Sequence, residues 1–404
     1  METDADVIIA GAGPAGTLAA YELATHGHSV LILEKAAFPR YKVCGAGLTH
    51  KIIREIPFDI SPILETEINQ VIFTKGFKDQ FARTSSGALL YCTNRDILDD
   101  YLLAKAVEAG ARVIHGEKVT EVSQEKGFVK VITRSGTYRS SLLIGADGAS
   151  SSVARSAGLR EHIMPGLAWE AEIKVDEASL ARYSGTVFLD WGSFPGGYGW
   201  VFPKKDHLSI GVGGPATLSK WMMPYYDKLV NYLEKDCGIR VTETSSLKSW
   251  PIPVRVKRSR FHNGRVLVAG DAGGLTDPLT GEGIYYAVRS GKIAAECCHN
   301  YLVSKSPSLA PYSDMVNREL MPELLEANRI KFLFNTVPLR IHLFVRDSER
   351  AWRAFGKILR GERWYKDVPA GFGYWKLLWG AACLVSKCIS DFRERKFKRE
   401  GFDG

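Results

Sequence analysis

The chain has 404 residues, of which 45% are hydrophobic and 24% are charged, the composition of an ordinary globular protein. Its length favours two or three sub-structures over a single core. The formal net charge is +8, which suits an anionic partner, although a plain basic surface explains it equally well. No RNA- or DNA-binding motif accompanies this charge, so we expect no nucleic-acid partner.

The seven cysteines are irregularly spaced and include no CxxC pair. This pattern argues against a disulfide framework and against a zinc or iron–sulfur site, so we expect no metal. A reducing, cytoplasmic compartment fits best. The acidic N-terminus lacks the features of a signal peptide. The apolar stretch over residues 377–386 is about half as long as the roughly twenty residues that a membrane-spanning helix needs.

The N-terminal segment predicts a complete β–α–β unit. Residues 6–10 read as a short buried strand, 14–25 as a helix and 29–34 as a second strand. The turn between the first two is Gly11-Ala-Gly-Pro-Ala-Gly16, which matches the dinucleotide-binding pattern. Gly11 permits the tight turn, Gly13 lets the backbone approach a pyrophosphate, and Gly16 lets the helix pack on the strand.

The same unit predicts further cofactor contacts. The first turn of the helix, around Ala15, offers unpaired N–H groups to phosphates. Glu34 ends the second strand and is placed to bind ribose hydroxyls. The motif alone does not separate FAD from NAD.

The middle of the chain predicts a mixture of sheet and helix. A strand-like stretch over 71–82 precedes an amphipathic helix over 96–109, a strand over 112–115, a meander over 118–139 and an apolar strand over 141–146. Residues 159–250 read mainly as sheet, with strands over 169–175, 185–190, 199–202 and 207–213 and one helix over 219–234.

A second glycine-rich motif follows a buried strand over 265–269. Gly270 and Asp271 end that strand, and Gly281 and Gly283 open a long helix. Asp271 is placed to accept hydrogen bonds from a ribityl chain. The helix N-terminus is placed to stabilise the negative charge of a reduced isoalloxazine. Two such motifs in one domain indicate FAD.

These elements predict an α/β (α+β) fold with three parts. A Rossmann-like FAD-binding domain is discontinuous, over 1–70, 94–158 and 252–300. An antiparallel, sheet-rich substrate domain, over 71–93 and 159–251, is inserted in it. A helical C-terminal region over 301–404 follows.

The motifs resemble those of the FAD-binding group that includes the aromatic hydroxylases. Three motifs stand in the right order: Gly11–Gly16 with Glu34, then Gly145-Ala-Asp-Gly148, then Gly270-Asp271. Within this group the chain is most similar to the geranylgeranyl reductase family, through Lys42-Val-Cys-Gly-Ala-Gly-Leu48, Tyr198-Gly-Trp-Val-Phe-Pro203 and Asp277-Pro-Leu-Thr-Gly-Glu-Gly-Ile284. Ala46 departs from the pattern, since glycine is expected there. The cofactor contacts that the resemblance implies are Lys35, Cys44, Gly45, Arg95, Gly145, Asp147, Gly148 and Ile284.

The resemblance also implies the reaction, which is reduction of isolated C=C bonds in a polyprenyl lipid by hydride from reduced FAD. It leaves NAD(P)H and a ferredoxin open as electron donors. A long apolar tunnel is expected over the flavin, lined by Trp191, Tyr198, Trp200 and Phe202. The alternative is that these aromatics belong to the core. Cys44 is expected to gate the flavin or to supply a proton, and the alternative is a small buried residue.

Two other functions remain open. One is a flavin-dependent monooxygenase or halogenase on the same scaffold, although Val201 and Phe202 argue mildly against halogenation. The other is a non-catalytic prenyl-binding protein, against which the intact flavin motifs argue.

The C-terminal region places apolar clusters beside basic residues. One cluster runs from Phe332 to Phe344, another from Trp375 to Leu384, and basic residues follow over 393–399. This pattern is typical of an interfacial helix, so peripheral contact with a membrane is one hypothesis. The other is a helical lid on the substrate domain with a solvated basic tail.

Overall fold

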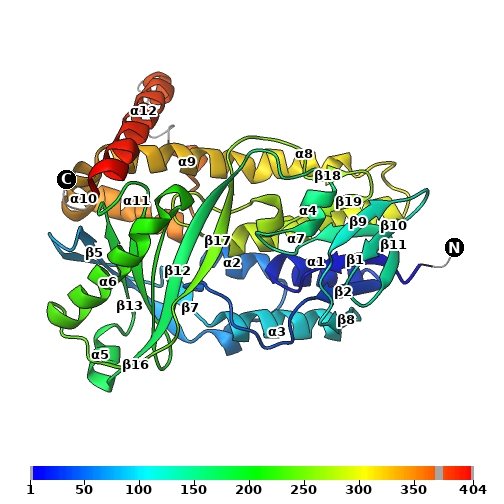
Figure 1. Cartoon of the computed structure of the whole chain (residues 1–404), viewed down its shortest axis with the longest axis horizontal. Helices are drawn as coiled ribbons and strands as arrows, with labels where there is room; N and C mark the ends of the chain where they lie inside the picture. The colour runs from blue at the N-terminus through cyan, green and yellow to red at the C-terminus, as the bar shows by residue number, and fades with distance from the viewer. Residues whose placement is uncertain (1–2, 369–375, 402–404) are drawn as a thin grey trace.

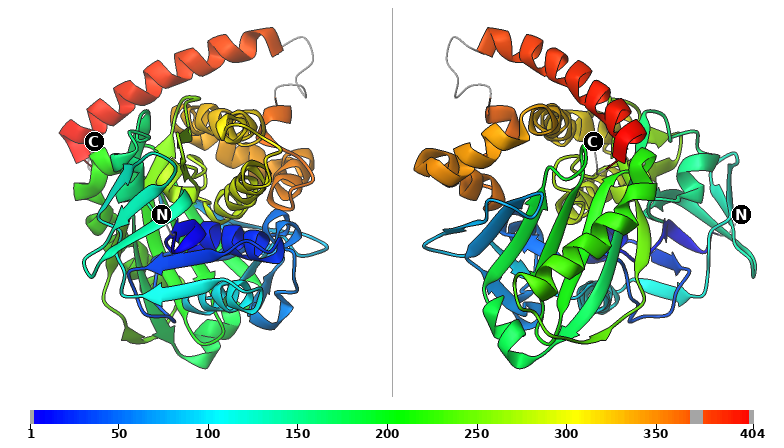
Figure 2. Two further views of the ribbon diagram at one scale, coloured as in Figure 1. Left: turned by 90° about the vertical axis from the view of Figure 1, so that its right-hand side faces the viewer. Right: turned by 60° about the vertical axis from the view of Figure 1, so that its left-hand side comes forward.

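Two large sheets and a group of C-terminal helices make up the protein (Figure 1). The structure, a computed structural model, describes residues 3–368 and 376–401, with side chains in the last helix from Ala382 onward. In Figure 1 the first sheet lies towards the N-terminal end of the long axis and the second towards the opposite end. The C-terminal helices run along one side of both sheets (Figures 1 and 2).

The first sheet contains the predicted β–α–β unit. Its strands are, in order, β18 (His262–Asn263), β19 (Val266–Val268), β11 (Thr137–Gly145), β1 (Ala5–Ala10), β2 (Val30–Glu34) and β8 (Arg112–His115), with β10 (Val129–Ile132) and β9 (Glu121–Gln124) extending from β11. β1 pairs in parallel with both β2 and β11. Parallel strands covered on both faces read as continuous apolar runs, which is why Val7, Ile8 and Ile9 are fully buried.

Helices on the first sheet form the main core. They are α1 (Pro14–Thr25), α3 (Arg95–Glu108), α4 (Ser152–Ser156) and α7 (Ile284–Leu302). α1 packs closely against α7 and also contacts α3. The long helix that was predicted to open at Gly281 and Gly283 is present as α7, but it begins at Ile284, after the glycines.

β11 corrects the prediction of a separate meander strand and apolar strand. It is one continuous strand over both stretches. Its first half pairs antiparallel with β10, and its second half pairs in parallel with β1 and β19. The two serines at its middle, Ser140 and Ser141, interrupt the apolar pattern without ending the strand, and the Ser140 hydroxyl donates to the carbonyl of Leu142.

The second sheet is mostly antiparallel. Its strands are, in order, β16 (Val241–Thr244), β12 (Ile163–Val175), β15 (Leu208–Pro215), β14 (Tyr198–Pro203), β13 (Thr186–Trp191), β5 (Gln70–Lys75) and β6 (Phe81–Thr84), with β17 (Lys248–Arg255) paired to β12. Helix α6 (Ser219–Lys235) packs on β15 and β12. A third, small sheet joins β3 (Gly47–Thr49), β7 (Leu90–Cys92) and β4 (Thr66–Ile68), beside α2 (His50–Glu55) and the 3-10 turn η1 (Ser61–Ile63).

Three details of the second sheet differ from the predictions. The stretch over 71–82 is a hairpin, because Phe77 and Asp79 adopt positive φ angles of 62° and 56° and reverse the chain. A second helix, α5 (Glu177–Arg182), interrupts the sheet; six residues are too few to show a helical period. The sheet also extends through β17 to Arg255, past the predicted boundary at 251–252.

The C-terminal region is helical. It contains α8 (Ala310–Glu319), α9 (Met321–Thr336), α10 (Pro338–Asp347), α11 (Glu349–Leu359) and α12 (Lys376–Glu400), with a 3-10 turn η4 (Tyr365–Asp367). α12 lies across α9, where the Thr336 hydroxyl donates to the Ser386 carbonyl at 3.0 Å. Within the described residues, none of the helices is both long and apolar enough to cross a membrane.

A pair of histidines at the ends of α1 and α7 makes stability depend on pH. His28 Nε2 lies 2.9 Å from His299 Nδ1, and burial lowers the pKa of both rings from the ordinary value of 6.5. The folded protein therefore binds fewer protons here than the unfolded chain does, so acid favours unfolding. We expect the free energy of unfolding in urea to be lower at about pH 5.5 than at about pH 7.5.

The variant His28→Gln removes part of this dependence, whereas His115→Gln, at an exposed position, leaves it unchanged. An identical pH dependence in His28→Gln and the wild type would contradict the assignment.

Candidate active site

One large cavity, of about 2740 Å³, runs through the molecule. It begins beside Gly13 and Glu34 in the first sheet, passes Cys44 and Asp271, and reaches the C-terminal helices at Phe334. The cavity therefore joins the predicted cofactor site to the predicted substrate domain.

The three glycines of the first motif have different surroundings. A Cβ on Gly16 would stand 2.0 Å from the Gly11 carbonyl oxygen, and one on Gly11, whose φ is 99°, would stand 2.5 Å from the Ala146 oxygen. Both glycines are required by packing. A Cβ on Gly13 meets only the Arg40 Nη2 atom, at 3.9 Å. Gly13 lines the cavity at the N-terminus of α1, so a phosphate can approach this backbone closely.

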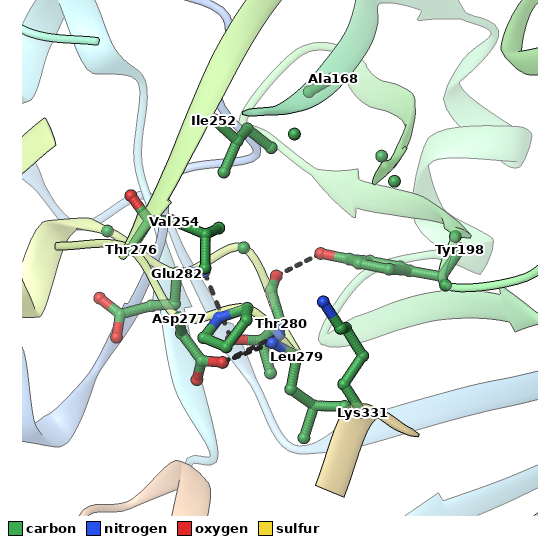
Figure 3. A pocket seen from close by; sticks show the side chains of 18 of the residues that line it. Ala168, Tyr198, Ile252, Val254, Thr276, Asp277, Leu279, Thr280, Glu282 and Lys331 are labelled. Carbon is green, nitrogen blue, oxygen red and sulfur yellow. Dashed lines mark hydrogen bonds between the residues drawn. The ribbon is translucent and has the colours of Figure 1, made fainter. Parts of the chain in front are cut away.

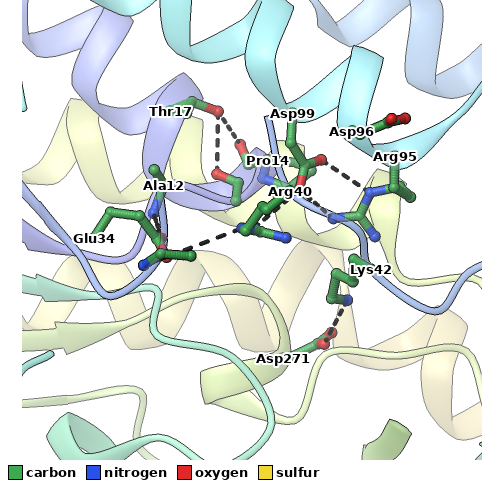
Figure 4. A network of polar contacts seen from close by, with 12 residues as sticks. Ala12, Pro14, Thr17, Glu34, Arg40, Lys42, Arg95, Asp96, Asp99 and Asp271 are labelled. Carbon is green, nitrogen blue, oxygen red and sulfur yellow. Dashed lines mark hydrogen bonds and ion pairs between the residues drawn. The ribbon is translucent and has the colours of Figure 1, made fainter. Parts of the chain in front are cut away.

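Glu34 is buried at the end of β2, and its carboxylate fastens the turn (Figure 4). Oε2 accepts from the Ala12 N–H at 2.7 Å, and Oε1 accepts from the Ala36 N–H at 2.9 Å. Each carboxylate oxygen keeps a second lone pair, and Glu34 lines the cavity together with Lys35. The predicted ribose contact is therefore compatible with this geometry.

A network of charged side chains, of which only Arg95 was predicted as a cofactor contact, adjoins this site (Figure 4). Arg95 holds Asp99 through two hydrogen bonds, of 2.9 and 2.7 Å, and Arg40 reaches the same carboxylate at 3.0 Å. Arg40 Nε also lies 4.0 Å from Glu34. The four-residue spacing of Arg95 and Asp99 on α3 is the one signal in the sequence that pointed to this network.

The second glycine motif lies next to the first, since a Cβ on Gly270 would stand 3.2 Å from the Ala15 Cβ. The 3-10 turn η3 (Gly270–Gly273) follows β19, and Asp271 forms an ion pair with Lys42 at 3.7 Å. The Thr276 hydroxyl donates to Asp271 at 3.4 Å. The remaining predicted residues of this motif that line the cavity are Gly270, Gly281, Gly283 and Ile284. The N-terminus of α7 therefore borders the cavity, as the N-terminus of α1 does.

The motif Gly145–Gly148 serves mainly to cap a helix and to permit close packing. The Asp147 carboxylate accepts hydrogen bonds from the Ser152 N–H at 2.8 Å and the Val153 N–H at 3.2 Å, so it caps α4. Asp147 and Gly148 line the cavity, whereas Gly145 and Gly16 do not. A Cβ on Gly145 would stand 2.6 Å from the Val153 side chain, so this glycine permits close packing behind the site.

These features fit FAD. Four features line one cavity: the Glu34 carboxylate, the open backbone at Gly13 before α1, the Asp271 carboxylate, and the N-terminus of α7. They suit, respectively, the ribose, the pyrophosphate, the ribityl chain and the ring of FAD. The chain would hold FAD through these groups.

The Cys44 loop lies beside the same cavity. The Cys44 Sγ accepts from the Ala46 N–H at 3.4 Å, and Arg95 lies within hydrogen-bonding reach of the thiol. Ala46 has a φ of 44°, the left-handed region that favours glycine, which explains why glycine is expected there. Gly45 and Gly47 pack on Phe202, since a Cβ on either would stand 3.0 Å from its ring.

The four predicted aromatic residues all line the cavity. Tyr198 and Trp200 lie on β14 with ring centroids 5.6 Å apart, and the Tyr198 hydroxyl donates to the Thr280 carbonyl (Figure 3). Trp191 contacts Phe334 of α9 at 5.8 Å. These rings pack in the core on one side and line the cavity on the other. Core packing and a place in the cavity wall are therefore compatible; contact with substrate stays a prediction.

Comparison with known proteins now identifies the family. Residues 4–292 match the family described as "FAD binding domain". The menaquinone reductase of Mycolicibacterium smegmatis is 32% identical over 317 residues, 73% of this chain and 76% of that protein. The digeranylgeranylglycerophospholipid reductase of Methanosarcina acetivorans is 30% identical over 326 residues, 78% of this chain and 79% of that protein. The chain belongs to the geranylgeranyl reductase family of FAD-dependent oxidoreductases.

Two solved structures share the fold of this geranylgeranyl reductase family member. A geranylgeranyl bacteriochlorophyll reductase-like protein from Thermoplasma acidophilum has a TM-score of 0.72 at 23% identity, covering 87% of this chain and 96% of the other. A flavin-dependent brominase has a TM-score of 0.71 at 22% identity, covering 97% and 99%. At such identities the likeness shows the fold alone, and the predicted fold class is confirmed.

Two further charged residues line the cavity (Figure 3): Asp277, which was quoted only as the start of a family motif, and Lys331, which was not predicted. The Asp277 carboxylate accepts from the N–H groups of Leu279 at 2.7 Å and Thr280 at 3.2 Å, and burial raises its pKa. Lys331 extends from α9 into the cavity, and burial lowers its pKa. In this family member, α9 thus supplies a wall of the site, although its sequence carries no recognisable motif.

Proposed function

We propose that this protein saturates isolated C=C bonds of a polyprenyl lipid, such as a geranylgeranyl lipid, with hydride from reduced FAD. The observation that carries the proposal is the continuity of the FAD cradle with a large cavity walled by aromatic and aliphatic side chains. A folded polyprenyl chain needs an apolar space of this kind next to the flavin.

The chain's own residues have separable tasks in this reaction. Backbone N–H groups at the start of α1, with Glu34 and Asp271, bind and orient FAD, which supplies the hydride when reduced. Tyr198, Trp200, Phe202 and Trp191 hold the lipid and exclude water. The Cys44 thiol delivers the proton that the second carbon requires. Arg95, beside the sulfur, stabilises the thiolate that remains.

Anaerobic single turnover tests the function. The purified yellow protein is reduced with dithionite, mixed with a geranylgeranyl lipid, and followed by flavin absorbance and by mass spectrometry of the lipid. We expect the flavin to reoxidise while the lipid gains two hydrogens per turnover. If the flavin stays reduced until air enters and the lipid is unchanged, the reductase proposal fails and an oxygen-using monooxygenase or halogenase takes its place.

The electron donor is proposed to be NAD(P)H or a ferredoxin. Mixing the oxidised protein anaerobically with NADPH, NADH or reduced ferredoxin and following flavin bleaching identifies the donor. Bleaching by none of the three would contradict both assignments.

We also propose that the mouth of the cavity docks on a membrane surface. Phe344 of α10 and Leu384 of α12 are 60% and 68% exposed, yet both line the cavity. Phe392 continues the exposed apolar face of α12, and the exposed basic residues Lys387 and Arg393 flank it. An exposed apolar patch with basic flanks fits an anionic lipid surface. Trp375 lies outside the described residues, and the side chains of Leu377, Leu378 and Trp379 do too.

Vesicle flotation checks this surface. The double variant Leu384→Ser/Phe392→Ser is expected to bind vesicles of phosphatidylcholine and anionic phosphatidylglycerol at least about tenfold more weakly, since each side chain loses its apolar burial in the bilayer. The control is Ile97→Ser/Val107→Ser, which removes two exposed apolar side chains of α3. Equal flotation of both double variants would favour the lid hypothesis instead.

A further inference from the structure

The Cys44 loop separates two cavities. On one side lies the large cavity that contains the cofactor cradle. On the other lies a small polar cavity of about 10 Å³, which has room for at most one water molecule. Cys44 and Arg95 border both cavities, whereas Glu170, Lys204 and Ser209 border only the small one. These three residues therefore approach the loop from behind, away from the reacting groups.

Glu170 holds the loop at Cys44. This residue lies in the middle of β12 and is 2% exposed. Its Oε2 accepts a hydrogen bond from the Cys44 backbone N–H. Its Oε1 accepts from the Ser209 hydroxyl, on the neighbouring strand β15, at 2.6 Å. Both carboxylate oxygens are thus committed, and one of them is committed to the residue that carries the thiol.

Lys204 holds the next residue of the loop. It follows β14 and is 4% exposed. Its ammonium donates to the Gly45 carbonyl at 2.6 Å and to the Thr93 carbonyl, also at 2.6 Å. Thr93 lies two residues before Arg95, the first residue of α3. One cation therefore ties the Cys44 loop to the segment that positions the arginine beside the thiol.

Burial makes these contacts strong. A charged group out of water is costly unless hydrogen bonds compensate it, and charge-assisted hydrogen bonds are the stronger ones. Glu170 and Lys204 have opposite charges, yet among the described side chains they form no ion pair with each other. Each charged group forms its hydrogen bonds mainly with backbone and hydroxyl groups. Both side chains bind the two-residue segment Cys44–Gly45. Buried charged groups can fix one conformation at a cost in stability.

We propose that Glu170 and Lys204 are positioning residues that clamp the Cys44–Gly45 segment from behind and fix the Cys44 thiol at the reacting bond. The inference rests on the proposed function, in which the thiol delivers the proton. Positioning matters there because a displacement of about 1 Å costs on the order of a hundredfold in rate. Glu170 and Lys204 would thus influence the reaction from the inserted domain without contacting the cofactor or the lipid.

The charged and titratable groups around the Cys44 segment come from every element packed on it. They are Tyr41 and Lys42 on the loop itself, Arg95 and Asp96 of α3, Glu170 and Glu172 of β12, Tyr198 of β14, and Lys204 with His207 between β14 and β15. Glu170→Gln replaces the carboxylate that receives the Cys44 N–H by a neutral amide. The weaker hydrogen bond loosens the loop and so exposes the Cys44 thiol to reagents.

Two readouts on the FAD-bound protein test the clamp. The first is alkylation of Cys44 by iodoacetamide, followed by mass spectrometry of its peptide so that the other cysteines do not interfere. The second is steady-state reduction of the geranylgeranyl lipid. For Glu170→Gln we expect alkylation about tenfold faster, because a weaker hydrogen bond lets the loop open more often, and a kcat at least about tenfold lower with KM and FAD affinity unchanged.

Glu172→Gln is the matched control. Glu172 lies two residues along the same strand and borders the same small cavity, but no hydrogen bond from the loop to its side chain occurs among the described residues. We expect both readouts to stay at the wild-type value. Ser209→Ala removes the hydroxyl that donates to Glu170, and we expect smaller changes of both readouts in the same direction. This variant replaces Glu170→Gln in the test if Glu170→Gln does not fold.

Two outcomes would overturn the clamp. One is alkylation of Cys44 at the wild-type rate in Glu170→Gln or, if that variant does not fold, in Ser209→Ala. The other is a loss of kcat that only follows the loss of bound FAD, as a structural role would give. Alkylation needs no lipid, so the clamp is judged even if the wild type reduces no lipid and the proposed function fails.

Discussion

Arg255→Met is expected to lower the free energy of unfolding by about 3 kcal/mol. Arg255 is 1% exposed at the end of β17. Its guanidinium donates to the carbonyls of Leu159 and Gly273 at 2.7 Å each and to that of Glu161 at 2.9 Å. Methionine fills a similar volume but leaves these buried oxygens without donors, and each buried unsatisfied group costs about 1–3 kcal/mol.

Urea denaturation of the FAD-free protein measures this change, because bound cofactor would add its own stabilisation. Arg155→Met is the control, since Arg155 is exposed on α4; a change within about 0.5 kcal/mol is expected there. Equal stability of the two variants would show that the buried guanidinium contributes nothing beyond its packing.

Gly13→Ala is expected to weaken FAD binding by about 10- to 100-fold without unfolding the protein. The φ of Gly13 is −78°, which alanine adopts freely, and a Cβ there has no neighbour closer than 3.9 Å. The fold therefore accepts the methyl group. That group projects into the cavity at the N-terminus of α1, where it would separate the backbone from a pyrophosphate.

Calorimetric titration of the FAD-free protein with FAD gives the affinity, and the flavin colour of the purified variant gives a first indication. Gly136→Ala is the control, because a Cβ on this turn glycine meets no atom within 4 Å and the residue does not border the cavity. Wild-type affinity in Gly13→Ala would place the pyrophosphate elsewhere.

The elements with a strong local signal could be predicted from the sequence. The apolar runs that became β1 and β2 and the glycine turn before α1 leave few alternatives. The hairpin of β5 and β6 was missed although its turn contains Gly76 and Asp79, two usual turn residues, because Phe77, which also has a positive φ, reads as a strand residue. The continuity of β11 depends on partners on both sides that no local pattern reveals.

The site could be predicted where glycine motifs mark it and not where packing creates it. Gly13, Asp271 and the aromatics of β14 all border the cavity. Glu170 and Lys204 carry no motif, and only the pairing of β12 and β15 places a buried carboxylate behind Cys44. Lys331 reaches the cavity because α9, which packs against α8, α10 and α12, borders it. Such groups become visible only when distant segments are brought together.

The pairing of β12 with β17 has a consequence for how the chain folds during synthesis. β11 must wait for β19, since every strand of the second sheet except β5 and β6 emerges from the ribosome between them. β12 and β17 are the first and last strands of that insertion, and Ile163 lies opposite Arg255. Once β12 and β17 have paired, only two short connections remain between β11 and β19, one from β11 to β12 and one from β17 to β19. Most of the loop-closure entropy has then already been lost, so the parallel sheet around β1 can close quickly even though its partners are far apart in sequence.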